Sequence, residues 1–341
     1  MPSFRAAPLL DVLTVGEPMV LFMADAPGDL ASVQQFSQAA AGAELNVATG
    51  LARLGLRVGY LSRLGDDAFG RYVSGVIAQE GIDARYLRTD AQHPTGFMRK
   101  GRTLDGSDPQ IEYHRKGSAA SYLSLADWQA LNGDGIFPAR HLHLTGITPA
   151  LSESARALVF GLARQARAAG ASISFDPNLR PRLWPSQVVM VACLNALAQE
   201  AGGTVLPGLA EGQLLTGCDS PEGIADFYLQ RGAAQVVVKL GAQGAFFADC
   251  HGRSATLAAA HVDRVVDTVG AGDGFAVGVI SALLEGLDLP VACARGNTIG
   301  ARVLQFPGDA DGLPTRIQLQ GAELYPNQGY PPIHVLLWKV P

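Results

Sequence analysis

The segment from Asp267 to Asp273, with the sequence Asp-Thr-Val-Gly-Ala-Gly-Asp, carries the residue types best suited to chemistry. Gly270, Ala271 and Gly272 form a turn of small residues that leads directly into the apolar stretch GFAVGVISALLEG, which predicts a helix. Backbone N–H groups at such a turn, together with the positive end of the helix, favour anionic oxygen, such as that of a phosphoryl group in transfer. The carboxylate of Asp273 directly follows the turn and could take a proton from an attacking hydroxyl group.

The same segment has two other interpretations. Asp273 could be only a capping acid at the start of a glycine-rich helix, and the local string favours neither interpretation over the other. A dinucleotide-binding turn fits less well, because the glycines at 270, 272 and 274 do not follow the GxGxxG spacing and lie late in the chain. The phosphate-binding pattern GxxxxGK followed by Ser or Thr does not occur in the sequence.

Strand-like and helix-like patterns alternate along the chain. Residues 9–16 predict a buried first strand, and residues 42–55 place apolar side chains on one face of a helix. Further strands are expected at VGYLSRLG, LHLTGI, SISFD and VVVKLG, with helices at FGRYVSGVIAQEG and SARALVFGLARQARAAG. This alternation indicates an α/β fold in which a mainly parallel sheet is covered by helices.

Residues 93–118 break the alternation with two short strand-like pieces around a Gly/Asp/Pro turn. We expect a hairpin that projects from the core, joined by residues 17–24, either as a lid over a site or as surface decoration. Exposed strand edges in such a lid could pair two copies of the chain into a homo-oligomer. The core domain is expected over residues 9–318, followed at 319–341 by a tail of uncertain structure.

The amino-acid composition limits the partners that the protein can bind and the location that we expect for it. Of 341 residues, 48% are hydrophobic and 17% are charged, which is typical of a globular protein. The formal net charge of −5 gives no general attraction to nucleic acid or to an anionic membrane, so local donors must hold any anionic ligand. The four cysteines form no CxxC pair, and His141 and His143 alternate in a strand-like segment, so no metal site made of protein ligands is predicted. The N-terminus makes a poor signal peptide and no stretch approaches a membrane span, so we expect a soluble cytoplasmic protein.

Two motifs together resemble the ribokinase-like (PfkB) carbohydrate kinases. The first is Gly42-Ala-Glu-Leu-Asn46-Val-Ala with Arg63-Leu-Gly-Asp-Asp67-Ala-Phe-Gly70 downstream, and the second is the 267–273 segment, about 200 residues later. The resemblance runs from about residue 10 to residue 315. It implies the family fold, a central mainly parallel sheet flanked by helices with a small β-strand lid. It also implies ATP as the phosphoryl donor, Mg²⁺ bridging the phosphates, and Asp273 as the base.

Four further strings resemble one branch of this family, the 2-keto-3-deoxygluconate kinases. They are Gly16-Glu-Pro-Met19, Tyr113-His-Arg-Lys-Gly-Ser118, His143-Leu-Thr-Gly-Ile147 and Asp176-Pro-Asn-Leu-Arg180-Pro-Arg-Leu-Trp184. By this resemblance, the residues that contact the sugar acid would be Gly42, Asn46, Tyr113, Arg115, Ile147, Arg180 and Asp273, with Asp309 close by. The residues on the nucleotide side would be Asn178, Glu211, Lys239, Gly241, Gly244, Gly270, Gly272 and Asn297.

A sugar acid carries a carboxylate, which guanidinium groups bind through paired donors. Arg115 and Arg180 come from separate segments and could converge on one ligand, whose carboxylate would then be the charged partner of both; alternatively, each is only a surface or lid charge. Two positions depart from the family pattern. Gly208 stands where the family has Asn or Ser, three residues before Glu211, and Met98 replaces an aromatic residue that some deoxygluconate kinases place against the substrate.

The sequence therefore predicts transfer of the ATP γ-phosphoryl group to the terminal hydroxyl of 2-keto-3-deoxygluconate. A kinase of the same fold that acts on a neutral sugar, such as fructose or ribose, is the first alternative. A non-catalytic ligand-binding protein on this fold is the second, and the intact Asp273 and glycine turn weigh against it.

Overall fold

The computed structural model describes residues 10–103, 108–133 and 135–324. Its centre is a nine-stranded sheet in the order β13-β12-β11-β10-β9-β8-β1-β4-β5. Neighbouring strands from β11 to β5 pair in parallel, and β12 and β13 extend the sheet antiparallel. The strands are β1 (Leu10–Val15), β4 (Val58–Gly65), β5 (Leu87–Asp90), β8 (Ala139–Thr145), β9 (Ser172–Asp176), β10 (Thr204–Val205), β11 (Gln235–Lys239), β12 (Ala245–Asp249) and β13 (Ser254–Leu257).

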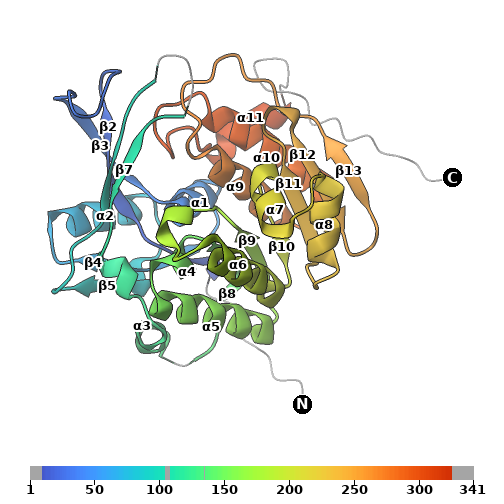
Figure 1. The fold of residues 1–341 in the computed structure, drawn as a ribbon, viewed down its shortest axis with the longest axis horizontal. Helices are drawn as coiled ribbons and strands as arrows, with labels where there is room; N and C mark the ends of the chain where they lie inside the picture. Colours follow the sequence, from blue (N-terminus) through green and yellow to red (C-terminus); the bar gives the residue numbers. More distant parts are fainter. Residues whose placement is uncertain (1–9, 104–107, 134, 325–341) are drawn as a thin grey trace.

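Helices cover both faces of this sheet (Figure 1). One core contains side chains from α1 (Ala43–Arg53), α2 (Ala68–Gln79), α9 (Ala271–Leu284), α10 (Leu289–Val303) and α11 (Arg316–Leu324). The other contains side chains from α3 (Leu125–Leu131), α4 (Thr148–Leu151), α5 (Glu153–Ala169), α6 (Gln187–Ala201), α7 (Leu209–Thr216) and α8 (Pro221–Leu229). Short 3₁₀ turns lie at Ala84–Tyr86, Ala119–Tyr122, Pro181–Leu183 and Gly241–Gln243.

The central strands are rich in apolar residues because both of their faces are buried. In β1, Val12 packs into the first core, whereas Leu13 and Val15 pack into the second. Side chains of a strand alternate between faces, so a strand between two helical layers carries apolar residues on both faces. The predicted α/β fold with a mainly parallel sheet flanked by helices is confirmed.

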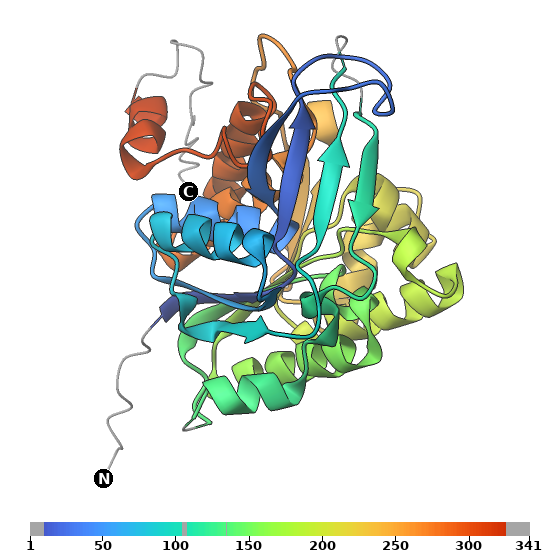
Figure 2. The same cartoon turned by 90° about the vertical axis from the view of Figure 1, so that its left-hand side faces the viewer.

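A second sheet of four strands, the lid sheet, has the order β3-β2-β6-β7. Its strands are β2 (Met19–Ala24), β3 (Phe36–Ala41), β6 (Phe97–Lys100) and β7 (Ile111–His114). Figure 2 shows the blue strands β2 and β3 beside the teal strands β6 and β7, and Figure 1 places this sheet on the opposite side of the molecule from β13. Strands β6 and β7 lie within the predicted hairpin at 93–118, whereas β3 was not predicted. Pairing of two copies through the lid edges stays a prediction.

Asp67 connects the lid sheet to the core through hydrogen bonds. Its carboxylate caps helix α2 by accepting a hydrogen bond from the Gly70 N–H at 2.7 Å, and it also accepts from the Thr95 N–H at 2.8 Å, just before β6. Burial disfavours this carboxylate, but the hydrogen bonds prevail and lower the pKa of Asp67 below its ordinary value. The capping acid of the first motif therefore fixes where the lid leaves the core.

The C-terminal part of the described chain continues past the expected end of the core at 318. Helix α11 runs to Leu324, and the side chain of Leu319 is only 2% exposed because it packs into the core. The apolar stretch 334–338 of the predicted tail lies outside the described residues. Among the helices of the described ranges, none combines the length and apolar character needed to cross a membrane.

Candidate active site

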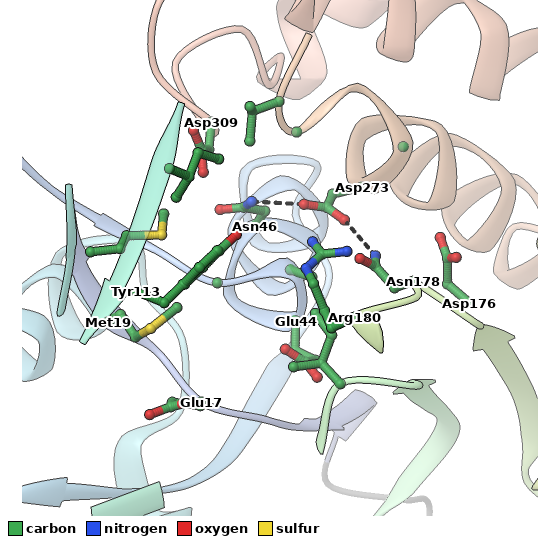
Figure 3. Close-up of a pocket in the computed structure, with 18 of the residues that line it drawn as sticks. Glu17, Met19, Glu44, Asn46, Tyr113, Asp176, Asn178, Arg180, Asp273 and Asp309 are labelled. Atoms are coloured by element: carbon green, nitrogen blue, oxygen red, sulfur yellow. Dashed lines mark hydrogen bonds between the residues drawn. The ribbon is translucent and has the colours of Figure 1, made fainter. Parts of the chain in front are cut away.

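A cavity of ≈ 520 Å³ lies where the carboxyl ends of the parallel strands face the lid sheet. Glu17 follows β1, Ile147 follows β8, Asp176 ends β9 and Lys239 ends β11, and all four line the cavity. Parallel strands end at the same edge of a sheet, which is why ligands of α/β folds bind there. Tyr113 of β7 closes the lid side (Figure 3).

The turn before α9 forms one wall of this cavity. Gly270 is the residue before the helix and has φ 84, a left-handed conformation that glycine adopts without strain. A Cβ atom at Gly270 would lie 2.3 Å from the Asp309 carbonyl oxygen, so the turn packs directly on the Asp309 backbone. At Gly272, by contrast, a Cβ atom would meet only the Lys239 Nζ, at 3.6 Å. The turn therefore presents backbone to the cavity next to a lysine ammonium.

The Asp273 side chain is held by two asparagines from other segments. The Asn46 Nδ2 donates to Asp273 Oδ2 at 2.7 Å, and the Asn178 Nδ2 donates to Oδ1 at 3.4 Å (Figure 3). Within the described residues, no side chain caps the first turn of α9. Asp273 thus projects toward the cavity instead of serving as a cap.

The pKa of Asp273 suits a base that works near neutral pH. Burial raises the pKa of Asp273 to about 7, although the hydrogen bond from Asn46 acts in the opposite direction. The neighbouring negative charge of Asp176 adds to the rise. A carboxylate with a pKa near the working pH is an effective proton acceptor.

The segment after β9 carries Asn178 and Arg180 into the cavity. Asn178 has φ 44, a left-handed conformation that asparagine tolerates better than most residues. The Arg180 Nη1 donates to the Leu179 carbonyl oxygen at 2.9 Å. Across the described ranges Arg180 forms no ion pair, and Figure 3 shows its guanidinium pointing toward Asp273. Arg180 is therefore a cation available to an anionic ligand.

Lys239 and Asp176 form a buried ion pair at the base of the cavity. Their Nζ and Oδ2 atoms are 2.6 Å apart, and the Asp176 Oδ1 is buried without a hydrogen-bond partner in the part of the chain described. Burial raises the pKa of Asp176 to about 6, against the attraction of Lys239. A buried acceptor without a donor is costly, and the Oδ1 atom can still accept a hydrogen bond from a bound ligand.

Glu211 holds two backbone segments together. Its Oε1 accepts from the Leu179 N–H and its Oε2 accepts from the Gly208 N–H, both at 2.8 Å. A Cβ atom at Gly208 would lie 3.3 Å from the Glu211 Oε2, so the side chain that the family usually has there would sit beside this acid. The glycine keeps the backbone hydrogen bond but places no polar side chain beside Glu211.

Arg115 does not depend on a ligand for a charged partner, and its contact with the sugar acid stays a prediction. Arg115, which is 8% exposed, forms an ion pair with the buried Glu17, with its Nε 2.6 Å from Oε2, and Ser118 donates to the other oxygen of Glu17. Arg115 lines the cavity, but its charge is already compensated. Glu17 belongs to the segment Gly16-Glu-Pro-Met19, and an acid within this apolar run could have indicated a buried partner for a cation.

The lid wall and the first helix complete the cavity. Met98 and Tyr113 are paired neighbours of β6 and β7, and both line the cavity, so methionine occupies the place of the aromatic residue.

Gly42 has φ 145, and a Cβ atom there would lie 2.7 Å from the Glu17 carbonyl oxygen, so the backbone needs glycine. Glu44, a second acid that the sequence reasoning missed, is buried and accepts from the hydroxyls of Thr145 and Thr148.

Three residues predicted on the nucleotide side lie apart from the cavity lining. Gly241 is exposed in the turn after β11, Gly244 immediately precedes β12, and the Asn297 Nδ2 donates to the Ala258 carbonyl oxygen at 2.9 Å. Their nucleotide role stays a prediction. The remaining predicted site residues all line the cavity, except Ala271, which begins α9: they are Gly42, Asn46, Tyr113, Arg115, Ile147, Asn178, Arg180, Glu211, Lys239, Gly270, Gly272, Asp273 and Asp309.

The two strand histidines are structural. Burial lowers the pKa values of His141 and His143 to about 3, and their ring nitrogens contact the hydroxyls of Ser172 and Ser174. Within the described residues, no group of three or more His, Cys, Asp or Glu side chains is arranged to hold a metal ion.

Comparison with known proteins agrees with this geometry. The model of the pfkB family of carbohydrate kinases matches residues 10–316. The chain is 50% identical over 311 residues to a 2-dehydro-3-deoxygluconokinase of Bacillus subtilis (strain 168), covering 91% of this chain and 94% of that protein.

Solved structures have the same fold. A PfkB protein from Polaromonas sp. JS666 superposes with a TM-score of 0.82 at 51% identity, covering 91% of this chain and 99% of that one. An aminoimidazole riboside kinase from Salmonella enterica, complexed with aminoimidazole riboside and an ATP analogue, superposes with a TM-score of 0.78 at 26% identity, covering 91% and 99%. With a family match over nearly all described residues, a half-identical relative and a buried acid beside a glycine turn, the chain belongs to the pfkB family of carbohydrate kinases and is an ATP-dependent sugar kinase.

Proposed function

We propose that this kinase transfers the ATP γ-phosphoryl group to the terminal hydroxyl of 2-keto-3-deoxygluconate, the compound also called 2-dehydro-3-deoxygluconate. The observation that carries the proposal is the guanidinium of Arg180, which has no ion pair among the described residues and lies beside Asp273. A neutral sugar leaves this cation without a partner, whereas a sugar acid supplies one. The half-identical relative that bears the name of this activity supports the same substrate.

In the proposed reaction the described residues have separate tasks. Asp273 takes the proton from the acceptor hydroxyl as the oxygen attacks phosphorus, and Asn46 keeps the carboxylate in place during the transfer. The backbone of the 270–272 turn and the start of α9 donate to the phosphoryl oxygens as negative charge develops on them. Lys239, whose ammonium is paired with Asp176, lies next to Gly272 and can donate a hydrogen bond to a phosphate oxygen on the same side.

Magnesium fits the nucleotide side of this cavity as a partner of the phosphates. Mg²⁺ usually keeps several waters and binds through one or two carboxylates in addition to substrate phosphates. The unpartnered Oδ1 of Asp176 is the buried oxygen best suited to that role, with Glu211 as a nearby acid. When bound, the ion would neutralise phosphate charge in the transfer.

A substrate screen tests the proposed acceptor. With ATP as donor, we expect kcat/KM for 2-keto-3-deoxygluconate to exceed that for fructose and ribose by roughly 10-fold or more, since one charge-assisted hydrogen bond contributes about 1.5–3 kcal/mol. ADP formation measured across sugar acids and neutral sugars gives the comparison. A preference for fructose or ribose would exclude the sugar acid as the main substrate while leaving the kinase assignment in place.

The acid limb of the pH profile is the second expected result. Asp273 must be ionised to accept a proton, and its pKa of about 7 lies well above the ordinary value, so the active form disappears as the pH falls below 7. We expect kcat/KM for the sugar to fall by about tenfold for each pH unit below that point. Sugar should be varied at saturating ATP, so that nucleotide binding does not limit the rate. A profile that stays flat from pH 5 to pH 8 would contradict a base with this environment.

A further inference from the structure

Lys100 of lid strand β6 reaches out of the lid sheet into the core. Its side chain is 2% exposed, and three oxygens surround its Nζ atom: Asp267 Oδ2 at 2.6 Å, Asp309 Oδ1 at 2.5 Å and the Pro307 carbonyl oxygen at 3.1 Å. The two carboxylates are also buried, with Asp267 7% and Asp309 4% exposed. One lid cation therefore occupies an oxygen cage built from two core segments.

Both acids of this cage hold the turn before Asp273. The other oxygen of Asp267 accepts from the Val269 N–H at 3.0 Å, which fixes the first half of the turn. The Asp309 backbone contacts Gly270 so closely that no Cβ atom would fit between them. The ammonium of Lys100 thus joins the two segments whose contact sets the shape of the turn.

The charge of Lys100 matters as much as its contacts. Without it, two buried carboxylates would lie next to a turn that must receive an anionic phosphoryl group. Burial opposes the charged form of the lysine, yet the attraction of Asp309 and Asp267 raises the pKa of Lys100 above its ordinary value. Removing one partner of a buried ion cluster leaves the remaining charges uncompensated, which is strongly destabilising.

We propose that Lys100 is a positioning residue for phosphoryl transfer, a tethered cation that shapes the 267–273 turn and links it to the lid. This inference rests on the proposed phosphotransfer. Its neighbour Arg99 offers a matched comparison, because it forms an ion pair with Glu112 of the adjacent lid strand and both side chains are 36% exposed. Loss of charge from the same strand can therefore be separated from loss of the cage cation.

The test is to replace the tethered cation with a free one. Lys100→Ala should lower kcat by roughly 10²-fold, the size expected for misplacement of a reacting group by about 1 Å, with a much smaller change in KM for the sugar.

Added ammonium or methylammonium should restore kcat by about tenfold, because a small cation can enter the space left among the three oxygens. Arg99→Ala and the unmodified enzyme should show no such stimulation, and sodium chloride at equal ionic strength is the salt control. A folded Lys100→Ala variant with kcat close to that of the unmodified enzyme, or equal stimulation of all three proteins by amines, overturns the proposal.

Thermal unfolding without substrates gives a readout that does not depend on the reaction. Lys100→Ala should lower Tm by roughly 5–15 °C, and ammonium should recover part of this loss in that variant alone. If Lys100→Ala does not fold, Lys100→Met combined with Asp309→Asn removes the excess charge, and the proposal then expects a folded enzyme with low kcat. Near-normal kcat in that double variant would overturn it. If the unmodified enzyme fails to phosphorylate the sugar acid, the proposed function fails, whereas the melting comparison still decides the role of Lys100.

Discussion

Replacing Asp273 with asparagine is expected to lower turnover by roughly 10²–10⁴-fold, because the amide keeps the shape of the carboxylate but cannot accept the hydroxyl proton. Sugar binding should weaken much less, since the amide oxygen can still accept one of the two hydrogen bonds that Asn46 and Asn178 donate to the carboxylate. Steady-state kinetics with the sugar acid, together with binding measured by calorimetry, separate the two effects. Near-normal turnover in this variant would exclude Asp273 as the base.

The same variant should be at least as stable as the unmodified enzyme, and the difference should depend on pH. The pKa of Asp273 in the folded protein lies above its ordinary value, so its contribution to stability is present at low pH and is lost as the pH rises through about 7. Asparagine carries no charge to bury, so its advantage in Tm should be larger at pH 8 than at pH 5. Asp288→Asn is the control, because Asp288 caps helix α10 and lies outside the cavity lining.

Local sequence patterns were enough to predict the core of the fold and the glycine turn that lines the cavity. Strands such as β1 and β11 are short apolar runs, and the helix after Asp273 follows a run of small residues, so each signal is contained within one segment. Strand β3 was missed because FSQAAA has neither alternating apolar residues nor a β-branched residue, and it becomes a strand through its pairing with β2. The pairing with β2, and not the local sequence, therefore makes residues 36–41 a strand.

The charge balance of the cavity could not be obtained from the sequence. Arg115 is paired with Glu17 across 98 positions of the chain, and Lys100 with Asp309 across 209 positions. Neither pair follows a local spacing rule, because such contacts depend on how the lid sheet meets the core. The sequence therefore indicated which cations line the cavity, but only the structure shows which of them are already paired with a carboxylate.

Because Arg115 is paired within the described residues and Arg180 is not, substitution of Arg180 is the more specific test for a substrate carboxylate. With Arg115 compensated by Glu17, Arg180 is the cavity arginine that a carboxylate can still pair with. Arg180→Ala should lower kcat/KM for the sugar acid by roughly 10–100-fold, since each charge-assisted hydrogen bond contributes about 1.5–3 kcal/mol. Arg180→Lys should recover only part of the loss, because it keeps the charge without the planar pair of donors. Arg182→Ala is the matched control, since Arg182 is exposed and lies outside the cavity lining.

One further effect of Arg180 must be separated from carboxylate binding. Its positive charge helps to lower the pKa of Asp273 against the larger effect of burial, so Arg180→Ala should move the acid limb of the pH profile to higher pH. That shift impairs the base equally for every acceptor, whereas loss of a carboxylate partner harms only the sugar acid. The measurement is therefore kcat/KM for the sugar acid and for fructose, both taken on the alkaline plateau, in the unmodified enzyme and in Arg180→Ala. A loss confined to the sugar acid identifies Arg180 as the group that binds the carboxylate. Equal losses on both sugars would mean that Arg180 acts on ATP, on Asp273 or on the fold, and the choice of a sugar acid would lose its structural support.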